Sequence, residues 1–238
     1  MISGNPKLIS PATYQSILEI SKKMGLPGTF EGTKHQWVIS EKDPWLARVF
    51  LPWNATPDNS GNLSLKDDFH LALVMIRAGI AVTGYFHNGE MLDHKVFRAY
   101  MVRQKQGKSQ IKYLKTKGKS RAGSRLRLGE SERFFEQINE RLQRYAADYP
   151  ITTWGISCGK TLWPYFFDST TPPPFSKKQV NLRSIPFHVQ QPDFDTLQAV
   201  HKKLNGIHLL LSDEGRRKFE TIAVSVDSKP EQLDQDDW

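Results

Sequence analysis

The sequence has only one cysteine, Cys158, among its 238 residues. A single thiol cannot close a disulfide within the chain or build a cysteine-rich zinc site, so we expect no disulfide-linked partner. The sequence also lacks any apolar run of about 18 residues, which excludes a transmembrane helix and predicts no membrane association. Its amino terminus lacks the basic and then apolar pattern of a secretory signal. A reducing cytoplasm is therefore the expected location.

Acidic residues are absent between Arg103 and Arg127. This segment carries ten basic residues: Arg103, Lys105, Lys108, Lys112, Lys115, Lys117, Lys119, Arg121, Arg125 and Arg127. The rest of the chain has slightly fewer basic than acidic residues, so the net charge of +8 comes from this one segment. A solvated face usually mixes both signs, and a block of one sign more often contacts phosphate. A polyanionic partner is therefore expected, with a merely solvated arm as the alternative.

The chain is long enough for one large or two small domains, and its composition divides it into three parts. Residues 1–65 form an N-terminal extension or subdomain rich in tryptophan, residues 66–215 form the main domain, and residues 216–238 form an acidic tail. We expect the end of this tail, from Asp227 to Trp238, to be disordered. We expect the tryptophans of the first part to lie mostly in its core, with an aromatic RNA-stacking platform as the alternative: Trp37, Trp45 and Trp53.

The main domain reads as α/β. An apolar run over 70–79 and the turn signal Asn88-Gly89 predict three antiparallel strands, because both turn residues tolerate positive φ. A helix follows, with apolar residues at helical spacing from Phe134 to Tyr145. Further runs predict alternating strands and helices: strands over 151–157 and 183–190, a helix over 194–206 and an apolar run over 207–212. The expected fold is a mixed sheet of three antiparallel strands and then alternating helix and strand, preceded by a helix over 11–24 in the N-terminal extension.

The usual signatures of catalysis are weak in this sequence. The run from Gly155 to Thr161 resembles a phosphate-binding loop, but three residues separate its glycines where four are required, and we expect no helix after Leu162. The seven histidines form no pair at helical metal-binding spacing, so we expect no metal site and no cofactor. Cys158 is expected to be a small buried residue rather than a nucleophile.

The basic segment itself carries a family resemblance. The run from Tyr100 to Gln110, with Gly107 three residues before Gln110, and the run from Lys119 to Arg127 before an amphipathic helix resemble the Vms-like release factors. This family includes the ankyrin-repeat zinc-finger peptidyl-tRNA hydrolases of ribosome quality control. Class I release factors have Gly-Gly-Gln, whereas this sequence has the looser G-x-x-Q form that also occurs in the Vms-like group. The resemblance is specific over 100–145, and it identifies a stand-alone, prokaryotic member.

The resemblance implies an RNase H-like fold, related to the middle domain of eukaryotic and archaeal class I release factors, for the catalytic domain of residues 66–215. It implies a peptidyl-tRNA hydrolase that acts on stalled ribosomal large subunits, with Gln110 as the catalytic residue and peptidyl-tRNA as a partner. A neutral Gln can orient a water and stabilise an oxyanion through amide groups. The residues expected to contact RNA are Arg103, Lys105, Gly107, Lys108, Ser109, Lys112, Lys115, Lys117, Lys119, Arg121, Gly123, Ser124, Arg125 and Arg127.

Three alternatives remain open. Some relatives cut tRNA near its 3′ CCA end, so the bond that is broken is not decided by the motif. In the second alternative the protein is not catalytic, and its basic segment only binds RNA or the ribosome. A two-metal nuclease of the RNase H-like superfold is the third, and it would need clustered carboxylates that the predicted strands do not show. Because like charges repel and apolar anchors are few, we also expect the basic segment to be poorly ordered in the isolated protein.

Overall fold

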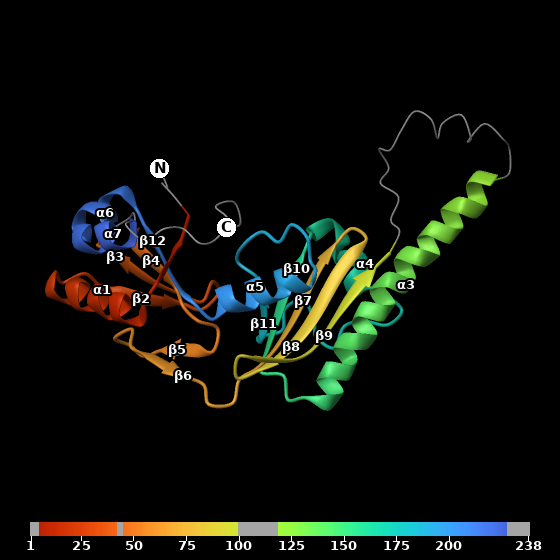
Figure 1. Cartoon of the computed structure of the whole chain (residues 1–238), viewed down its shortest axis with the longest axis horizontal. Helices are drawn as coiled ribbons and strands as arrows, with labels where there is room; N and C mark the ends of the chain where they lie inside the picture. The colour runs from red at the N-terminus through yellow and green to blue at the C-terminus, as the bar shows by residue number, and fades with distance from the viewer. Residues whose placement is uncertain (1–4, 42–44, 100–118, 228–238) are drawn as a thin grey trace. The chain divides into compact units, whose positions relative to one another are not determined.

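The computed structural model describes residues 5–41, 45–99 and 119–227, with only the backbone described over 119–131. The chain forms two compact units (Figure 1). The first unit comprises Met1–Phe69, Pro186–His188 and Ala199–Trp238, and the second comprises His70–Ile185 and Val189–Gln198. No helix in the described part of the chain is long and apolar enough to cross a membrane.

The first unit contains an antiparallel sheet of five strands. Their order is β1 (Lys7–Ile9), β12 (Ile207–Leu211), β4 (Trp45–Phe50), β3 (Gln36–Ser40) and β2 (Gly28–Glu31). A small hairpin of β5 (Ala55–Pro57) and β6 (Leu63–Leu65) completes its strands. The first unit therefore has a sheet of its own, and β12, which comes from the C-terminal part of the chain, lies inside that sheet.

The predicted N-terminal helix is confirmed as α1 (Pro11–Lys23). Ser10 caps it, because its hydroxyl accepts a 3.1 Å hydrogen bond from the backbone N–H of Thr13. The apolar side of α1 packs into one core with the sheet, with Phe219 and with Ile222 of α7 (Glu220–Asp227); Phe219 follows the short helix α6 (Asp213–Lys218). Trp37 and Trp53 are each only 4% exposed. The prediction that tryptophans of this part lie in a core is confirmed for these two, which cannot offer a face to RNA.

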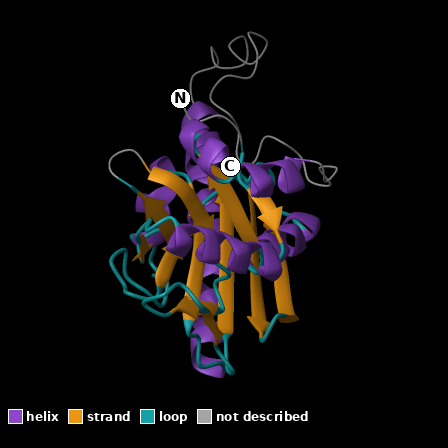
Figure 2. Ribbon diagram, turned by 90° about the vertical axis from the view of Figure 1, so that its left-hand side faces the viewer, coloured by secondary structure: helices purple, strands orange, loops and turns teal. Residues whose placement is uncertain are grey.

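The second unit contains a mixed sheet of five strands (Figure 2). Their order is β11 (Leu182–Ser184), β10 (Thr153–Cys158), β7 (His70–Arg77), β8 (Ile80–His87) and β9 (Glu90–Arg98). Neighbours from β7 to β9 are antiparallel, whereas β10 runs parallel to both β7 and β11. Asn88 and Gly89 form the β8–β9 turn with φ of 50° and 90°. The predicted α/β class with a mixed sheet is confirmed, and so are its three antiparallel strands.

Helices cover both faces of this mixed sheet. One face packs against α3 (Lys119–Asp148) and α4 (Trp163–Phe167) in a core that includes Phe134, Ile138 and Leu142. The other face meets the start of α5 (Phe194–Leu204), where Leu197 lies over Gly84 of β8. Alternate residues of β7 and β8 therefore serve two different cores, which explains why both strands are almost continuously apolar in sequence.

Three sequence-based expectations need correction. The strand predicted over 183–190 is only Leu182–Ser184, because Pro186 cannot donate a hydrogen bond to the ladder. The apolar run after α5 is a strand of the antiparallel sheet, between β1 and β4, and does not continue the mixed sheet. A short helix does follow Gly159: the 3₁₀ turn η1 (Lys160–Leu162) leads into α4, with Pro164 near the start of α4.

Close packing at Gly84 gives a stability prediction. A Cβ built at this position would lie 2.7 Å from the Cδ2 of Leu197, which is fully buried. We therefore expect Gly84→Ala to lower the free energy of unfolding by about 1–3 kcal/mol through overpacking. The matched control is Gly159→Ala, where the nearest atom to an added Cβ would be the hydroxyl oxygen of Thr161 at 3.8 Å. Urea unfolding of both variants measures the difference, and equal midpoints would contradict the packing argument.

Candidate functional site

The predicted catalytic segment is bounded by two elements of the second unit. The strand β9 ends at Arg98, and the next residue, Ala99, donates a 2.9 Å backbone hydrogen bond to the carbonyl of Gly79. The helix α3 begins at Lys119. The two ends of the segment are therefore attached to a paired strand and to a long helix. Gln110 and the predicted RNA-binding residues from Arg103 to Lys117 lie outside the described residues. The expectation that this segment is poorly ordered therefore stays a prediction.

The remaining predicted RNA-binding residues fall within the first turns of α3. These are Lys119, Arg121, Gly123, Ser124, Arg125 and Arg127, and the structure describes only their backbone. The helix begins at Lys119, well before the apolar spacing that starts at Phe134. Gly123 and Gly129 therefore lie inside the helix, where each costs about 1 kcal/mol relative to alanine. The predicted contacts of these residues with RNA stay predictions.

The C-terminal half of α3 fixes the helix to the mixed sheet. Five of its side chains are at most 3% exposed and pack into one core with β7, β8, β9 and β10: Phe134, Phe135, Ile138, Leu142 and Tyr145. Figure 1 shows α3 running beside β8 and β9, with its N-terminal part extending past the strand ends. The packed half therefore supports the half of the helix that carries the basic residues.

The sheet brings together two histidines that sequence spacing did not pair. His70 and His87 are opposite each other on β7 and β8, with ring centroids 4.3 Å apart and an interplanar angle of 11°. The Nδ1 of His70 lies 2.7 Å from the hydroxyl of Tyr85. With Asp68 they form a group whose possible ligand atoms all lie within 4.8 Å of one another, so these three residues could hold a metal ion, which the expectation of no metal site did not foresee. The pairing could have been found from the hairpin register, which places His70 and His87 opposite each other.

The run from Gly155 to Thr161 places Cys158 at the end of β10. Burial raises the pKa of the Cys158 thiol to about 11, against its ordinary value near 9. Little thiolate is therefore present at pH 7, which makes this thiol a poor nucleophile. Cys158 is half-buried against the core that contains α3, rather than fully buried as expected.

The raised pKa makes alkylation of Cys158 strongly pH-dependent. Because the thiolate is the reactive species, we expect iodoacetamide to modify native protein very slowly at pH 7 and about tenfold faster for each pH unit up to pH 10. Protein unfolded in urea should react faster at pH 7, since the free thiol has a pKa near 8.5. Mass spectrometry follows the modification. Rapid reaction of the native protein at pH 7 would contradict the burial argument.

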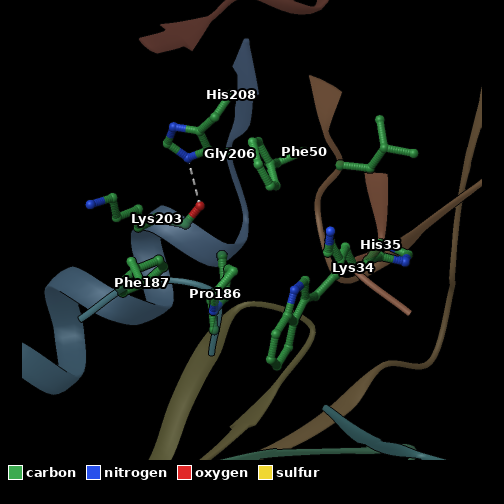
Figure 3. Close-up of a pocket in the computed structure, with 11 residues that line it drawn as sticks. Lys34, His35, Phe50, Pro186, Phe187, Lys203, Gly206 and His208 are labelled. Atoms are coloured by element: carbon green, nitrogen blue, oxygen red, sulfur yellow. Dashed lines mark hydrogen bonds between the residues drawn. The ribbon is translucent and has the colours of Figure 1, made fainter. Parts of the chain in front are cut away.

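A small pocket lies in the first unit (Figure 3). Its walls include Lys34, His35, Phe50, Lys203 and His208, and no acidic residue lines it. The Nε2 of His208 donates a 2.8 Å hydrogen bond to the carbonyl of Lys203, and burial lowers the pKa of this imidazole. The cavity volume is about 10 Å³, which holds about one water molecule. A drug-sized ligand needs a pocket of several hundred Å³, so this pocket is not a small-molecule site.

The second unit is thus a mixed α/β sheet whose strand β9 and helix α3 border a strongly basic segment. The family model described as "Bacteroidetes VLRF1 release factor" matches residues 71–211, more than half of the chain. The chain belongs to this release-factor family. The Vms-like family membership predicted from the sequence is confirmed, and a family described from Bacteroidetes agrees with a prokaryotic member.

Two other comparisons complete this finding. A solved structure titled "Vms1 mitochondrial localization core" is similar with a TM-score of 0.40 and 14% sequence identity. The match covers 85% of this chain and 89% of that chain. The comparison with curated proteins finds no match.

Proposed function

We propose that this protein is a peptidyl-tRNA hydrolase that releases nascent chains from stalled ribosomal large subunits. The observation that carries the proposal is the G-x-x-Q sequence, Gly107 to Gln110, between the end of β9 and the start of α3 in a chain of the release-factor family. Membership of this family supports a role in ribosome rescue. The domain assignment belongs to the same proposal: residues 66–215 are catalytic and residues 1–65 an extension. The expected tail of residues 216–238 needs correction, because its residues up to Asp227 form the end of α6 and α7, with Phe219 and Ile222 buried in the core of the first unit.

The proposed fold of the catalytic part is the RNase H-like arrangement of release-factor middle domains. The strand order of the mixed sheet supports it, because β7 lies centrally between its antiparallel hairpin partner β8 and its parallel partner β10. The helix α3 crosses from β9 to β10, as the connection between parallel strands requires. Such a scaffold fixes both ends of the G-x-x-Q segment.

Gln110 is the proposed catalytic residue. Hydrolysis of a peptidyl-tRNA ester needs an oriented water and stabilisation of the oxyanion that develops on the ester carbonyl. A glutamine supplies a side-chain carbonyl that accepts from water and N–H groups that donate to an oxyanion. Gly107 has no side chain, which allows a close approach of the backbone to RNA. The chemistry requires no cofactor and no metal ion.

The basic segment is the proposed RNA contact. Its ten cations would bind phosphates of ribosomal RNA and tRNA, while Gly107, Ser109, Gly123 and Ser124 would contact the backbone closely. The proposed partners are therefore the large ribosomal subunit and peptidyl-tRNA, and the proposed location is the cytoplasm, where both are found.

The test of this proposal is a release assay on large subunits that carry peptidyl-tRNA. The purified full chain is added to such complexes, and the released peptide is followed with time. Release that depends on the protein supports hydrolysis or cleavage of the tRNA. Binding to the complexes without any loss of peptidyl-tRNA would favour the docking-only alternative instead.

A further inference from the structure

Polar contacts, one of them fully buried, hold α3 on its packed half in addition to its apolar core. Apolar packing is not directional, so it limits rotation and sliding of a helix weakly compared with hydrogen bonds of fixed geometry. Buried polar groups can instead select one arrangement of packed elements. The polar side chains of this half of α3 therefore decide how firmly its orientation is fixed.

The first contact is made by Asn139, which is fully buried. Its side-chain amide donates two hydrogen bonds of 2.8 Å, one to the carbonyl of Phe166 at the end of α4 and one to the carbonyl of Thr171. Gln143, one turn further along the same side of the helix, donates a 2.7 Å hydrogen bond to the carbonyl of Pro172. One side of α3 is thus fastened to the segment from Phe166 to Pro172.

The second contact is made by Arg141, which forms an ion pair and hydrogen bond with Asp93 of β9. The side chains are 23% and 28% exposed, so the pair is only partly screened by water. The guanidinium also lies 5.2 Å from the ring centre of Tyr145. This second contact fastens α3 to the strand that leads into the G-x-x-Q segment.

The two contacts lie on opposite sides of the helix. Residues 139 and 143 are one turn apart, whereas residue 141 is about 200° further round the helix axis than residue 139. The helix start, Lys119, lies about 22 Å along the axis from Phe134, the first buried anchor whose side chain is described. A tilt of about 5° at the packed half would therefore move the start of the helix by about 2 Å.

We propose that Asn139 and the Arg141–Asp93 pair are positioning residues for the release reaction, because they hold α3 in one orientation from two sides. The expected effect on the release rate rests on the proposed function, whereas the fixed orientation of α3 does not. A displacement of about 1 Å at a reacting centre can lower a rate about 100-fold. The segment with Gln110 ends where α3 begins, so the orientation of α3 sets the position of one end of that segment.

The orientation is tested by a distance measured between two spin labels on the full chain, with no assay of activity. The labels are placed at Glu90→Cys in the β8–β9 hairpin and at Glu130→Cys on α3, in a Cys158→Ser background. We expect one narrow distance distribution for this reference. Asn139→Leu, which keeps the number and branching of the side-chain heavy atoms but removes both N–H donors, should broaden the distribution by several ångströms. Asp93→Ala should broaden it as well.

The matched control is Met75→Ala. Met75 is fully buried on β7 but lies outside the core that contains α3, so this variant destabilises the same unit without touching the helix. The control should keep the narrow distribution. In single-turnover release, Asn139→Leu and Asp93→Ala should lower kcat at least tenfold with KM nearly unchanged, and Asp93→Asn, which keeps an acceptor, should recover part of the loss.

Each result decides between distinct conclusions. An unchanged distance distribution in both Asn139→Leu and Asp93→Ala would overturn the inference, whatever their activity. Broadening with an unchanged kcat would overturn the positioning role. Broadening in a protein whose release is insensitive to Gln110→Ala would support the fixed orientation of α3 and overturn the assignment of Gln110, so the two proposals fail separately.

Discussion

Gln110→Ala should lower nascent-chain release by about 100-fold or more and leave binding to large subunits nearly unchanged. Loss of one oxyanion-stabilising donor lowers kcat by about two to three orders of magnitude in enzymes that depend on it. Glutamine carries no charge, so it contributes little to binding that is dominated by phosphate contacts. Single-turnover release and sedimentation with large subunits measure the two quantities on the same preparations.

Two other glutamines in the same segment provide matched controls. Gln104 and Gln106 lie nearer to the end of β9, and each precedes the Gly107–Gln110 sequence. We expect Gln104→Ala and Gln106→Ala to retain release within a fewfold of the unchanged protein. Full activity in Gln110→Ala would remove its catalytic role and favour a protein that only docks on the ribosome.

Binding to RNA should weaken steeply as the salt concentration rises. Each phosphate that a basic residue neutralises contributes about −0.7 to −0.9 to the slope of log K against log salt concentration. Because the ten cations cannot all reach phosphates at once, we expect a slope of about −4 to −7. Between 50 and 200 mM salt, affinity should then fall by about 10²- to 10⁴-fold. A titration of labelled tRNA by fluorescence anisotropy at several salt concentrations gives the slope.

The double variant of Arg125 and Arg127 tests how the start of α3 contributes to this binding. Replacing both with alanine should reduce the slope by about 1 to 2 units. If these arginines instead pair with Glu130 or Glu132 of their own helix, each pair is worth only about 0.2–0.5 kcal/mol. An unchanged slope with a lowered melting temperature would therefore assign both arginines to helix stability and remove them from the RNA contact.

Local patterns predicted much of the second unit. The Asn88-Gly89 turn fixes a hairpin because it supplies two residues with positive φ, and the helical spacing from Phe134 to Tyr145 marks the face of α3 that packs on the sheet. Local patterns could not predict which strands pair with β12. All five of its residues are buried, and such a run is equally apolar in either sheet, so the pattern does not reveal which strands it joins.

The polar contacts of α3 could not be predicted from the sequence either. Asn139 and Arg141 look like solvent-facing helix residues until the loop after α4 and the strand β9 are placed beside them. Their partners are backbone carbonyls and a residue 48 positions away, and no short-range spacing encodes such contacts. The candidate catalytic segment showed the opposite case. Its charge and its G-x-x-Q sequence were visible in the sequence alone, because both are properties of consecutive residues.

The products formed on a stalled large subunit test the central claim most directly. The full chain is incubated with complexes that carry peptidyl-tRNA, and the tRNA is then separated on a gel that resolves the intact 3′ CCA end from a shortened end. The account predicts released peptide together with tRNA that keeps its CCA end and can be aminoacylated again. Shortened tRNA with the CCA nucleotides still attached to the peptide would contradict ester hydrolysis and identify tRNA cleavage instead.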